Sequence, residues 1–382
     1  MSLFARSVCD NLIGTPTRQQ PYAHVYDVQA KIVARRPSAS PWPCNSFHHN
    51  KTLVIPKVHF HKMPQFKAWT YTTPGYPSAV LFSDISLPPL SKNQIHIRIQ
   101  ASALNPVDIQ LINLPIWYLP GLRYEKGIGE DFAGEVIGVG ADVSKWKIGD
   151  QVWGFTISPG GKFGTVGEVM PLDTTKAIIL PRKEGLKATE AASLPLVFLT
   201  AYTALVYYAQ IQDPPIEGAQ KRILVLGGST GVGIYALQIA AKRLGCHIVT
   251  TASTRNIDFV KSLGANEVID YTHTSVLKGA LTYLPDGGYD AIIDLVGGME
   301  LLPHLNTLLK PEAAYVTIVG DKTSRNKLGG AFIYPFFPRM VLRTVAGYLG
   351  YSRKYYCINL HAKEEYLEGN PTSQLARYGG LI

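Results

Sequence analysis

Residues 224–240 read Leu-Val-Leu-Gly-Gly-Ser-Thr-Gly-Val-Gly-Ile-Tyr-Ala-Leu-Gln-Ile-Ala, and this stretch decides the fold. It continues a short apolar, β-branched run, Lys221–Leu226, that is typical of a parallel strand buried on both faces. A glycine-rich turn follows, and then apolar residues at helical spacing as far as Gly245. Such a turn lets backbone N–H groups and a helix N-terminus meet a pyrophosphate. With a second strand predicted at Cys246–Ala252, the segment indicates a βαβ nucleotide-binding unit.

The end of the predicted second strand indicates which nucleotide binds. NAD-preferring sites place an Asp or Glu there, about 20 residues after the glycines, to bind the ribose 2′-hydroxyl. Here the chain reads Ala252-Ser-Thr-Arg-Asn-Ile257, and the first acid, Asp258, falls in the next predicted helix. The hydroxyls of Ser253 and Thr254 and the guanidinium of Arg255 are suited to a phosphate. The sequence therefore favours NADPH, with a solvated loop arginine as the alternative interpretation of Arg255.

Length and composition describe an ordinary globular protein with room for two domains. The 382 residues are 46% hydrophobic and 17% charged. The longest apolar candidate, Gly329–Tyr351, is interrupted by prolines and arginines, so we expect no transmembrane segment. The cysteines are too scattered for a metal site or a disulfide framework and fit a reducing compartment; they are Cys9, Cys44, Cys246 and Cys357.

The net charge of +9 is concentrated in residues 1–62, which hold eight Lys and Arg against two acids. The remainder has no basic patch with interleaved aromatics, so we expect no nucleic-acid partner. Scattered arginines with few acids suit a mitochondrial presequence, whereas the Pro-rich residues 37–43 favour an unstructured tail. An upstream start is a further alternative, because a self-contained domain begins at Met63. We expect a disordered or targeting extension on a cytoplasmic protein, with a mitochondrial location as the alternative.

The rest of the chain divides into a β-rich part and an alternating part. Apolar and polar residues alternate at Phe66–Thr72 and Gln94–Gln100, as in half-buried strands. Beyond a helical stretch at Ala188–Ala209, helix-length segments separate strands predicted at Lys221–Leu226, Cys246–Ala252, Glu267–Tyr271, Asp290–Val296 and Ala314–Val319. This alternation predicts an α/β fold with a doubly wound parallel sheet. We expect a smaller β-rich domain over 63–199, a Rossmann domain over 200–345 and a C-terminal segment over 346–382.

Further motifs occur in a fixed order. They are Ala-Leu-Asn-Pro-Val-Asp at 103–108, Gly-Glu-Asp-Phe-Ala-Gly at 129–134, Gly-Asp-Gln-Val-Trp-Gly at 149–154, Ala-Ala-Ser-Leu-Pro at 191–195, Leu-Thr-Ala-Tyr-Thr-Ala-Leu at 199–205, the glycine turn, Leu-Gly-Ala at 263–265 and Asp-Leu-Val-Gly-Gly at 294–298. Over about residues 63–365 the chain resembles the medium-chain dehydrogenase/reductase superfamily, in its zinc-free quinone oxidoreductase and enoyl reductase branch. The resemblance implies a GroES-like first domain, the substrate domain, before the Rossmann domain.

The chain departs from the pattern of that superfamily at three places. Its zinc-dependent members carry Cys where Asn105 or Pro106 stands and a His-Glu pair at residues 130–131, so the resemblance implies a metal-free protein. Thr230 stands where a second glycine is common, and we expect its hydroxyl to donate to a phosphate. Members usually continue beyond residue 367 with a helix and closing strands, so residues 346–382 are expected to be a truncated return segment.

The resemblance implies hydride transfer from NADPH to a quinone, enone or enal. Negative charge develops on the substrate oxygen, and a hydrogen-bond donor there lowers the barrier. Asn105 is the first candidate for that donor, with a turn residue before a proline as the alternative. Three tyrosines are candidate proton donors, although a core or interface role suits each better: Tyr118, Tyr124 and Tyr202. Asp108 and Asp131 are expected to brace loops.

The expected cofactor contacts form three groups. At the pyrophosphate we expect Ser229, Thr230, Gly231 and Val232. Around the adenosine phosphate we expect Ser253, Thr254, Arg255, Asn256 and, from the resemblance, Tyr271. Thr200 and the backbone at Val296 and Val319, after two strand ends, are expected at the nicotinamide.

The aromatic segment Phe332–Phe337 is expected to line the substrate cleft or to form a homodimer surface, with membrane contact as the third alternative. Three functions are compatible with the sequence. The first is an NADPH-dependent quinone or enone reductase, the second an enoyl reductase on acyl or polyketide intermediates, and the third an inactive NADPH-binding scaffold. Turnover with each substrate class separates them.

Overall fold

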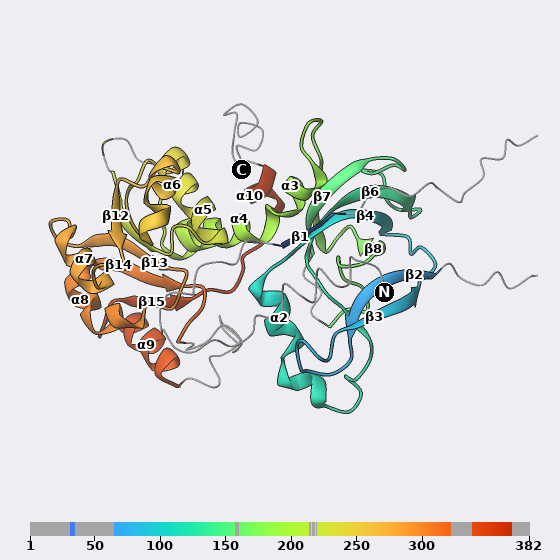
Figure 1. Ribbon diagram of the computed structural model, residues 1–382, viewed down its shortest axis with the longest axis horizontal. Helices are drawn as coiled ribbons and strands as arrows, with labels where there is room; N and C mark the ends of the chain where they lie inside the picture. The colour runs from blue at the N-terminus through green and yellow to red at the C-terminus, as the bar shows by residue number, and fades with distance from the viewer. Residues whose placement is uncertain are drawn as a thin grey trace, which may run out of the picture.

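A computed structural model describes residues 65–156, 160–213, 215, 218, 220–321 and 338–368, together with the backbone of residues 31–34. Most of the extension predicted for residues 1–62 lies outside the described residues, and so do the Phe332–Phe337 segment and residues 369–382. Figure 1 shows two lobes, an α/β lobe and a β-rich lobe, joined by helices near the middle of the molecule. The predicted α/β class with a second, β-rich domain is confirmed.

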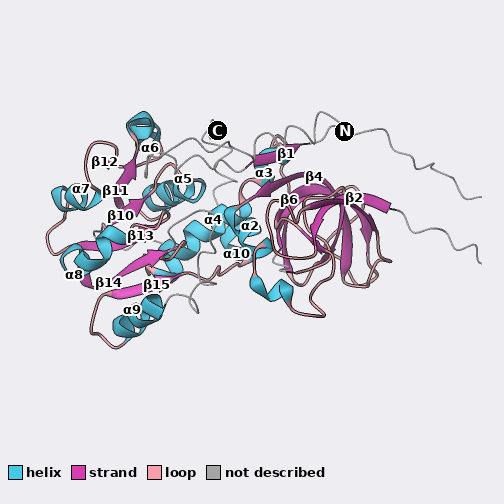
Figure 2. Cartoon of the chain, turned by 60° about the horizontal axis from the view of Figure 1, so that its bottom comes forward, coloured by secondary structure: helices cyan, strands magenta, loops and turns pink. Residues whose placement is uncertain are grey.

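The α/β lobe contains a six-stranded parallel sheet whose strands follow the order β12-β11-β10-β13-β14-β15 (Figure 2). Numbered along the chain, this order is 3-2-1-4-5-6, the doubly wound arrangement of dinucleotide-binding folds. The strands that follow β10 are added first on one side of it (β11, β12) and then on the other (β13, β14, β15). Ligands bind where the strand order reverses in this way, between β10 and β13. The strands are β10 (Arg222–Leu226), β11 (His247–Ala252), β12 (Glu267–Asp270), β13 (Tyr289–Asp294), β14 (Leu309–Thr317) and β15 (Lys354–Cys357).

Both faces of this sheet are buried, as the apolar run in β10 predicts. Ile223 and Val225 pack into one apolar core, whereas Leu224 and Leu226 pack into a second core on the opposite face. Successive strand residues point to opposite faces, so a strand covered on both sides is apolar throughout. Helices provide the cover: α5 (Gly231–Gln238), α6 (Ile257–Ser262), α7 (Val276–Thr282), α8 (Leu305–Leu308) and α9 (Pro338–Tyr348).

The β-rich lobe is built from antiparallel strands. One sheet has the order β1-β4-β6-β7-β9 with β8 also pairing β4, and a smaller sheet has the order β3-β2-β5. The short helix α2 (Pro106–Ile112) follows β4 directly. The strands are β1 (Lys31–Ala34), β2 (Gln65–Tyr71), β3 (Leu81–Ser86), β4 (Gln94–Leu104), β5 (Lys126–Gly127), β6 (Asp131–Val139), β7 (Gln151–Thr156), β8 (Val169–Asp173) and β9 (Ala177–Pro181).

Strand β1 differs from the sequence prediction, which places no regular structure in residues 1–62. Its backbone pairs antiparallel with Ala101–Leu104 of β4. Residue periodicity does not reveal such a strand, because main-chain hydrogen bonds to an open strand edge require no side-chain pattern. Likewise, β15 joins the parallel sheet, although the sequence places its residues in a separate C-terminal segment.

A central helical segment connects the lobes. It comprises α3 (Ala188–Ala192), α4 (Pro195–Tyr202) and a π-helical turn over Thr203–Tyr208. Helix α3 packs on β4, β6 and β7, whereas α4 packs on α5 and on α10 (Glu364–Glu368). The stretch Ala188–Tyr208 is long and apolar enough to cross a membrane, which the sequence analysis missed, but 78% of its most apolar window is buried inside the protein. It therefore forms part of the protein core.

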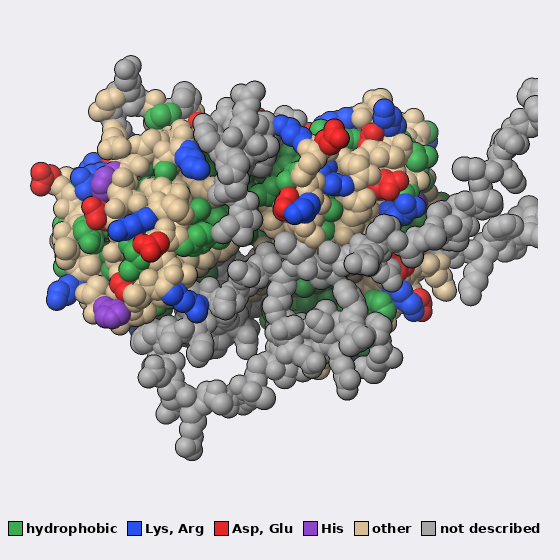
Figure 3. Space-filling model, turned by 45° about the horizontal axis from the view of Figure 1, so that its top comes forward, with side chains coloured by type: hydrophobic (Ala, Val, Ile, Leu, Met, Phe, Trp, Pro, Cys, Tyr) green, Lys and Arg blue, Asp and Glu red, His purple; other side chains and the backbone are tan. Residues whose placement is uncertain are grey.

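Charged side chains of both signs are interspersed on one face of the described residues. On the face in Figure 3, Lys and Arg side chains alternate with Asp and Glu over the described residues. No continuous basic stripe appears on that face. Nucleic-acid binding proteins concentrate positive charge on one face or along one helix.

Candidate functional site

The glycine turn connects β10 to α5 at the reversal point of the parallel sheet. Gly227 has a φ of 90°, and a Cβ atom there would lie 2.5 Å from Cγ1 of Val296. At Gly233, in the first turn of α5, a Cβ atom would lie 2.2 Å from the carbonyl oxygen of Gly227. Glycine is required at both positions, because any side chain would push the helix away from the strand. Gly231 differs, since the nearest atom to its Cβ position is Cγ1 of Val197 at 3.6 Å.

Thr230 caps α5 with its side chain. Its hydroxyl accepts a hydrogen bond from the N–H of Gly233 at 3.0 Å and donates to the carbonyl oxygen of Gly227 at 2.8 Å. A phosphate contact of this hydroxyl stays a prediction, and the hydroxyl proton is already used within the turn. The cause is the capping geometry, in which a β-region Thr binds the N3 amide. The threonine instead fixes the shape of the turn.

The N-terminus of α5 keeps donors for an anion. Helix geometry leaves the first amides without an intrahelical acceptor, and Thr230 satisfies only that of Gly233. The N–H groups of Gly231 and Val232 therefore remain at the positive end of the helix. The hydroxyl of Ser229 accepts from the Asn256 amide at 3.2 Å, which leaves its own proton available. The predicted pyrophosphate residues thus lie together and can bind an anion.

A second polar group lies where β11 and β12 end. Ser253 precedes a short 3-10 turn over Thr254–Asn256, and Tyr271 follows β12. Burial raises the pKa of the Tyr271 hydroxyl, opposed by a hydrogen bond with Ser253 and by the positive charge of Arg255. Arg255 is exposed and has no ion-pair partner within the described part of the chain. The structure thus brings Ser253, Arg255 and Tyr271 together beside the glycine turn.

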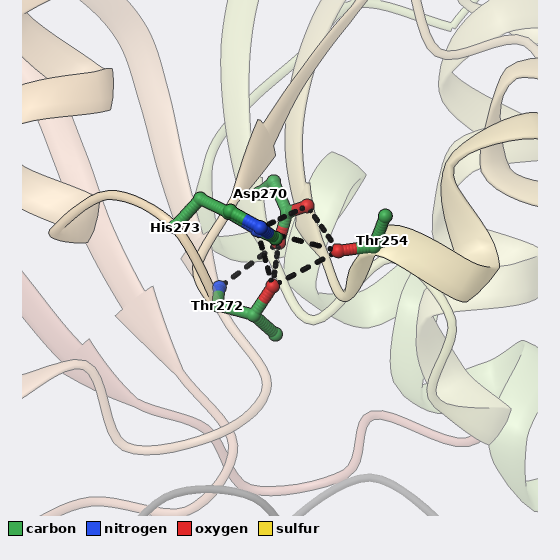
Figure 4. Close-up of polar contacts among 4 residues, drawn as sticks. All are labelled: Thr254, Asp270, Thr272 and His273. Atoms are coloured by element: carbon green, nitrogen blue, oxygen red, sulfur yellow. Dashed lines mark hydrogen bonds and ion pairs between the residues drawn. The ribbon is translucent and has the colours of Figure 1, made fainter.

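Thr254, in contrast, faces a carboxylate. Figure 4 shows its hydroxyl in a network with Asp270, Thr272 and His273. The hydroxyl donates to Oδ2 of Asp270 at 2.5 Å, and the Thr272 hydroxyl donates to Oδ1 at 2.6 Å. Desolvation opposes the charge of Asp270, but these hydrogen bonds prevail and lower its pKa to about 2. A carboxylate therefore already accepts the Thr254 proton in this structure, and the phosphate contact of this hydroxyl stays a prediction.

The ends of β13 and β14 approach the same turn. Oδ1 of the buried Asp294 accepts the N–H groups of Val296, Gly297 and Gly298 at 2.7–3.0 Å. The Val319 N–H likewise donates to the Thr317 hydroxyl at 3.2 Å. Because these amides point inward, the carbonyl oxygens are the backbone groups left for a ligand. Thr200, the third residue predicted near the nicotinamide, is buried in α4.

The β-rich lobe places polar residues opposite the glycine turn. The Asn105 amide donates to Oδ2 of Asp131 at 2.8 Å, and Oδ1 of Asp131 accepts the N–H of Leu196, the second residue of α4, at 2.9 Å. Asn105 is 4% exposed. One amide proton is thus committed to Asp131, which supports the alternative that Asn105 shapes the turn. Asp108 accepts the Asn105 N–H at 2.6 Å, and Asp131 accepts the two hydrogen bonds just described. Both aspartates therefore fit the predicted role of bracing loops.

The three candidate tyrosines lie in surface or packing positions. Tyr118 is exposed, and the ring of Tyr124 lies 4.3 Å from Nζ of Lys126. The Tyr202 hydroxyl donates to Asp213 at 2.5 Å; desolvation and this hydrogen bond raise its pKa. A phenol that already donates to a carboxylate is not free to protonate a substrate. Tyr202 fits the core alternative.

The side chains near Asn105 that could act as metal ligands do not suit zinc. Both oxygens of Asp131 and one oxygen of Asp108 already accept hydrogen bonds, and the described residues contain no group of three His, Cys, Asp or Glu that could hold a metal. Within that part of the chain, Cys246 and Cys357 are buried in the α/β lobe and form no disulfide. Zn²⁺ requires three or four converging ligands. No step of the chemistry is therefore assigned to a metal.

Two residues were missed by sequence reasoning. Asp294 was treated only as a marker of the strand end, although it fixes the following turn; the Asp-Leu-Val-Gly-Gly pattern, with small residues after a strand-end Asp, is a usable signal. Glu130 was considered only as a lost metal ligand. It is 7% exposed and lies near Asp108 and Asp131, and no local pattern announces this burial.

Fold and site together define a two-domain protein with a Rossmann dinucleotide site facing a β-rich lobe. Two family models match the chain: the alcohol dehydrogenase GroES-like domain over residues 91–181 and the zinc-binding dehydrogenase domain over residues 231–359. The chain belongs to the medium-chain dehydrogenase/reductase superfamily. It is therefore an oxidoreductase of that superfamily, whose fold implies a nicotinamide cofactor.

Individual relatives support this assignment. The trans-enoyl reductase pgmF of Aspergillus terreus is 34% identical over 269 residues, which cover 66% of this chain and 71% of that protein. The mitochondrial NAD(P)H oxidoreductase RTN4IP1 of Mus musculus is 32% identical over 294 residues, or 70% and 71% of the two chains. The structure of the quinone oxidoreductase from Coxiella burnetii matches with a TM-score of 0.64 and 28% identity, covering 81% of this chain and 88% of that one.

Proposed function

We propose that the chain is a zinc-independent, NADPH-dependent oxidoreductase that reduces a quinone or an α,β-unsaturated carbonyl compound. The observation that carries the cofactor choice is the Ser253–Arg255–Tyr271 group at the ends of β11 and β12. A free guanidinium with two hydroxyls suits a 2′-phosphate, whereas NAD-preferring sites carry an acid at the end of the second strand. The substrate class is supported by the names of the relatives.

Different residues of the chain would bind different parts of the cofactor. Gly231, Val232 and Ser229 would hold the pyrophosphate, and the carbonyl groups at Val296 and Val319 would orient the nicotinamide amide. Bound NADPH supplies hydride, whereas the protein supplies orientation and a cleft from which water is excluded. Asn105 remains a proposed substrate-positioning residue, acting through the amide proton that Asp131 does not use.

Substitution of Arg255 by alanine tests the cofactor choice. Loss of a charge-assisted contact costs about 1.5–3 kcal/mol, so we expect Kd for NADPH to rise roughly 10- to 100-fold. Kd for NADH should stay unchanged, because NADH lacks the 2′-phosphate. Titration calorimetry with both nucleotides measures the two values. Lys261→Ala, an exposed cation on the neighbouring helix α6, is the matched control, and equal losses for NADPH and NADH in R255A would refute the assignment.

Two other functions make different predictions in one assay. An enoyl reductase for acyl or polyketide intermediates, supported by the pgmF relative, would oxidise NADPH only with thioester-linked enoyl substrates. An inactive NADPH-binding scaffold would bind the nucleotide and turn over nothing. Following NADPH absorbance with benzoquinones, enals and enoyl thioesters separates the three. Turnover with a quinone or a free enal is the result we expect.

We also propose a homodimer formed through the α9–β15 edge. β15 is the last strand of the parallel sheet, and an open strand edge is a template for pairing. The adjoining helix α9 exposes four large apolar side chains, Val341, Leu342, Val345 and Tyr348. Light scattering on the eluting protein should give twice the 41.9 kDa chain mass. Leu342→Glu should yield a monomer, whereas a wild-type monomer would contradict the dimer.

The compartment is proposed as cytoplasmic, with mitochondria as the alternative supported by the relatives from that organelle. Cys246 and Cys357, which form no disulfide within the described residues, are compatible with either reducing environment. Imaging of the full chain carrying a C-terminal fluorescent protein against a mitochondrial marker distinguishes the two.

A further inference from the structure

A small cavity in the β-rich lobe has a polar lining that the proposed function does not yet use. It has a volume of about 20 Å³, close to the room that one water molecule or one carbonyl oxygen needs. Its walls come from β2, α2, residues 127–130 from the end of β5 to the residue before β6, and Gly160 and Phe163. Its polar lining consists of Tyr71, Asp108 and Glu130. The remaining lining is apolar or glycine.

One oxygen in this lining lacks a donor. Oδ2 of Asp108 accepts the N–H of Asn105, but Oδ1 is buried and no described residue donates to it. Asp108 as a whole is 3% exposed, so water outside the cavity cannot satisfy that oxygen. A buried polar atom without a partner is costly unless a ligand or an internal water supplies one. The cavity is therefore suited to bind a polar group that hydrogen-bonds to Asp108.

The residue that follows Glu130 connects the cavity wall with the glycine turn. Glu130 directly precedes Asp131, and Asp131 accepts the backbone N–H of Leu196 in α4. The next residue of α4, Val197, lies 3.6 Å from the Cβ position of Gly231 at the start of α5. A short chain of contacts thus connects Glu130 with the turn at which the dinucleotide would bind.

We propose that Glu130 is the catalytic acid of this enzyme, and that the cavity receives the carbonyl oxygen of the substrate. The proposal rests on the proposed reductase function. As the β-carbon accepts hydride, the carbon–carbon π electrons move toward the carbonyl and charge collects on its oxygen. The Glu130 O–H bond breaks and its proton goes to that oxygen, leaving a carboxylate that solvent reprotonates. The resulting enol tautomerises to the saturated ketone. With a quinone, the hydride-bearing carbon instead loses its other proton to water while the second oxygen gains one, and this tautomerisation gives the hydroquinone with no net further proton.

The surroundings keep Glu130 protonated at neutral pH. Burial is the main cause, and the nearby carboxylates of Asp108 and Asp131 add to it, so that the pKa of Glu130 rises to about 9. Burial also raises the pKa of Asp108 to about 7 and that of Tyr71 above its usual range. A neutral buried carboxylic acid can donate a hydrogen bond to a developing oxyanion.

Among the described residues, the cation near the cavity is Lys126, and its ammonium group already has hydrogen-bond partners. The ammonium of Lys126 donates to three carbonyl oxygens, those of Thr72, Leu122 and Tyr124, and lies 5.6 Å from the Tyr71 ring centre. Burial lowers the pKa of Lys126. Its hydrogen bonds hold the ammonium on backbone oxygens, which leaves the cavity acids without an ion-pair partner among the described residues. Glu130 is therefore the protonated group best placed for transfer.

The test compares Glu130→Gln with Glu135→Gln, a half-buried glutamate of β6 paired with Arg98. A general acid contributes roughly 10²- to 10⁴-fold, so we expect kcat of E130Q with an enone to fall at least 100-fold while Kd for NADPH stays unchanged. Wild-type kcat should decline as pH rises through about 9, where Glu130 ionises, and E130Q should lose that decline. E135Q should behave as wild type.

Two further measurements separate catalysis from folding. Asp108→Asn keeps an acceptor for Asn105 but removes a neighbouring charge, so the alkaline decline of kcat should move to lower pH. Infrared spectra at pH 7 should show bands of protonated carboxylic acids in wild type, and the difference between wild type and E130Q should contain a carbonyl band that belongs to Glu130. Unchanged kcat and pH profile, or an unchanged infrared band, would overturn the proposal. Absence of turnover in wild type would instead refute the reductase function, with the infrared test of Glu130 still decisive.

Discussion

Replacement of Gly233 by alanine is expected to abolish dinucleotide binding and to destabilise the α/β lobe. The new Cβ atom would lie 2.2 Å from the carbonyl oxygen of Gly227 and 2.7 Å from that of Gly228. Both obstacles are backbone, so α5 must move away from β10 as a unit. Such overpacking costs about 3 kcal/mol or more, which corresponds to a fall in Tm of roughly 6 °C or more.

The effect on binding should exceed the effect on stability. Moving α5 displaces the N–H groups of Gly231 and Val232 and breaks the Thr230 cap at once, so we expect Kd for NADPH to rise at least about 100-fold. Gly231→Ala is the matched control, because its Cβ has room within the protein and its Tm should equal that of wild type. If G233A melts and binds like wild type, the turn does not hold the nucleotide in the manner described.

Replacement of Asp294 by alanine should cause the largest loss of stability outside the turn. The carboxylate is 2% exposed; Oδ1 accepts three backbone amides, and Oδ2 accepts the hydroxyls of Tyr315 and Thr317 at 2.8 and 3.0 Å. Alanine leaves these donors buried without an acceptor, at a cost on the order of 4 kcal/mol. Urea denaturation measures the change.

A matched pair of variants defines the cause of that loss. Asp286→Ala removes an exposed carboxylate from the loop before β13 and should leave the free energy of unfolding within about 0.5 kcal/mol of wild type. Asp294→Asn keeps one oxygen acceptor and should fall between D294A and wild type. A D294A protein as stable as D286A would show that the turn after β13 does not depend on this carboxylate.

The sequence predicted the fold well because its strongest signals are local. The run Ile223–Leu226 is apolar throughout, and it forms a strand with alternate residues in two separate cores. The turn that follows needs glycine for steric reasons that hold in any protein with this geometry. Strand β1 was missed because pairing to a strand edge leaves no periodic trace in the sequence.

The site was predicted less completely because hydroxyl and carboxyl partners depend on tertiary contacts. Thr230 and Thr254 have the right chemistry for phosphate, but each hydroxyl already donates, one to a carbonyl of its own turn and the other to Asp270. Asn105 is similarly committed to Asp131, which lies 26 residues further along the chain. The unusual environment of Glu130 arises from burial beside two other acids, and burial of a single loop residue has no sequence period.

Titration calorimetry of the wild-type chain with NADPH and with NADH, in buffer containing a metal chelator, tests the central claim most directly. We predict saturable binding of one NADPH per chain, at least about tenfold tighter than NADH and independent of zinc. Equal affinity for the two nucleotides, or binding that appears only when zinc is restored, would contradict the account.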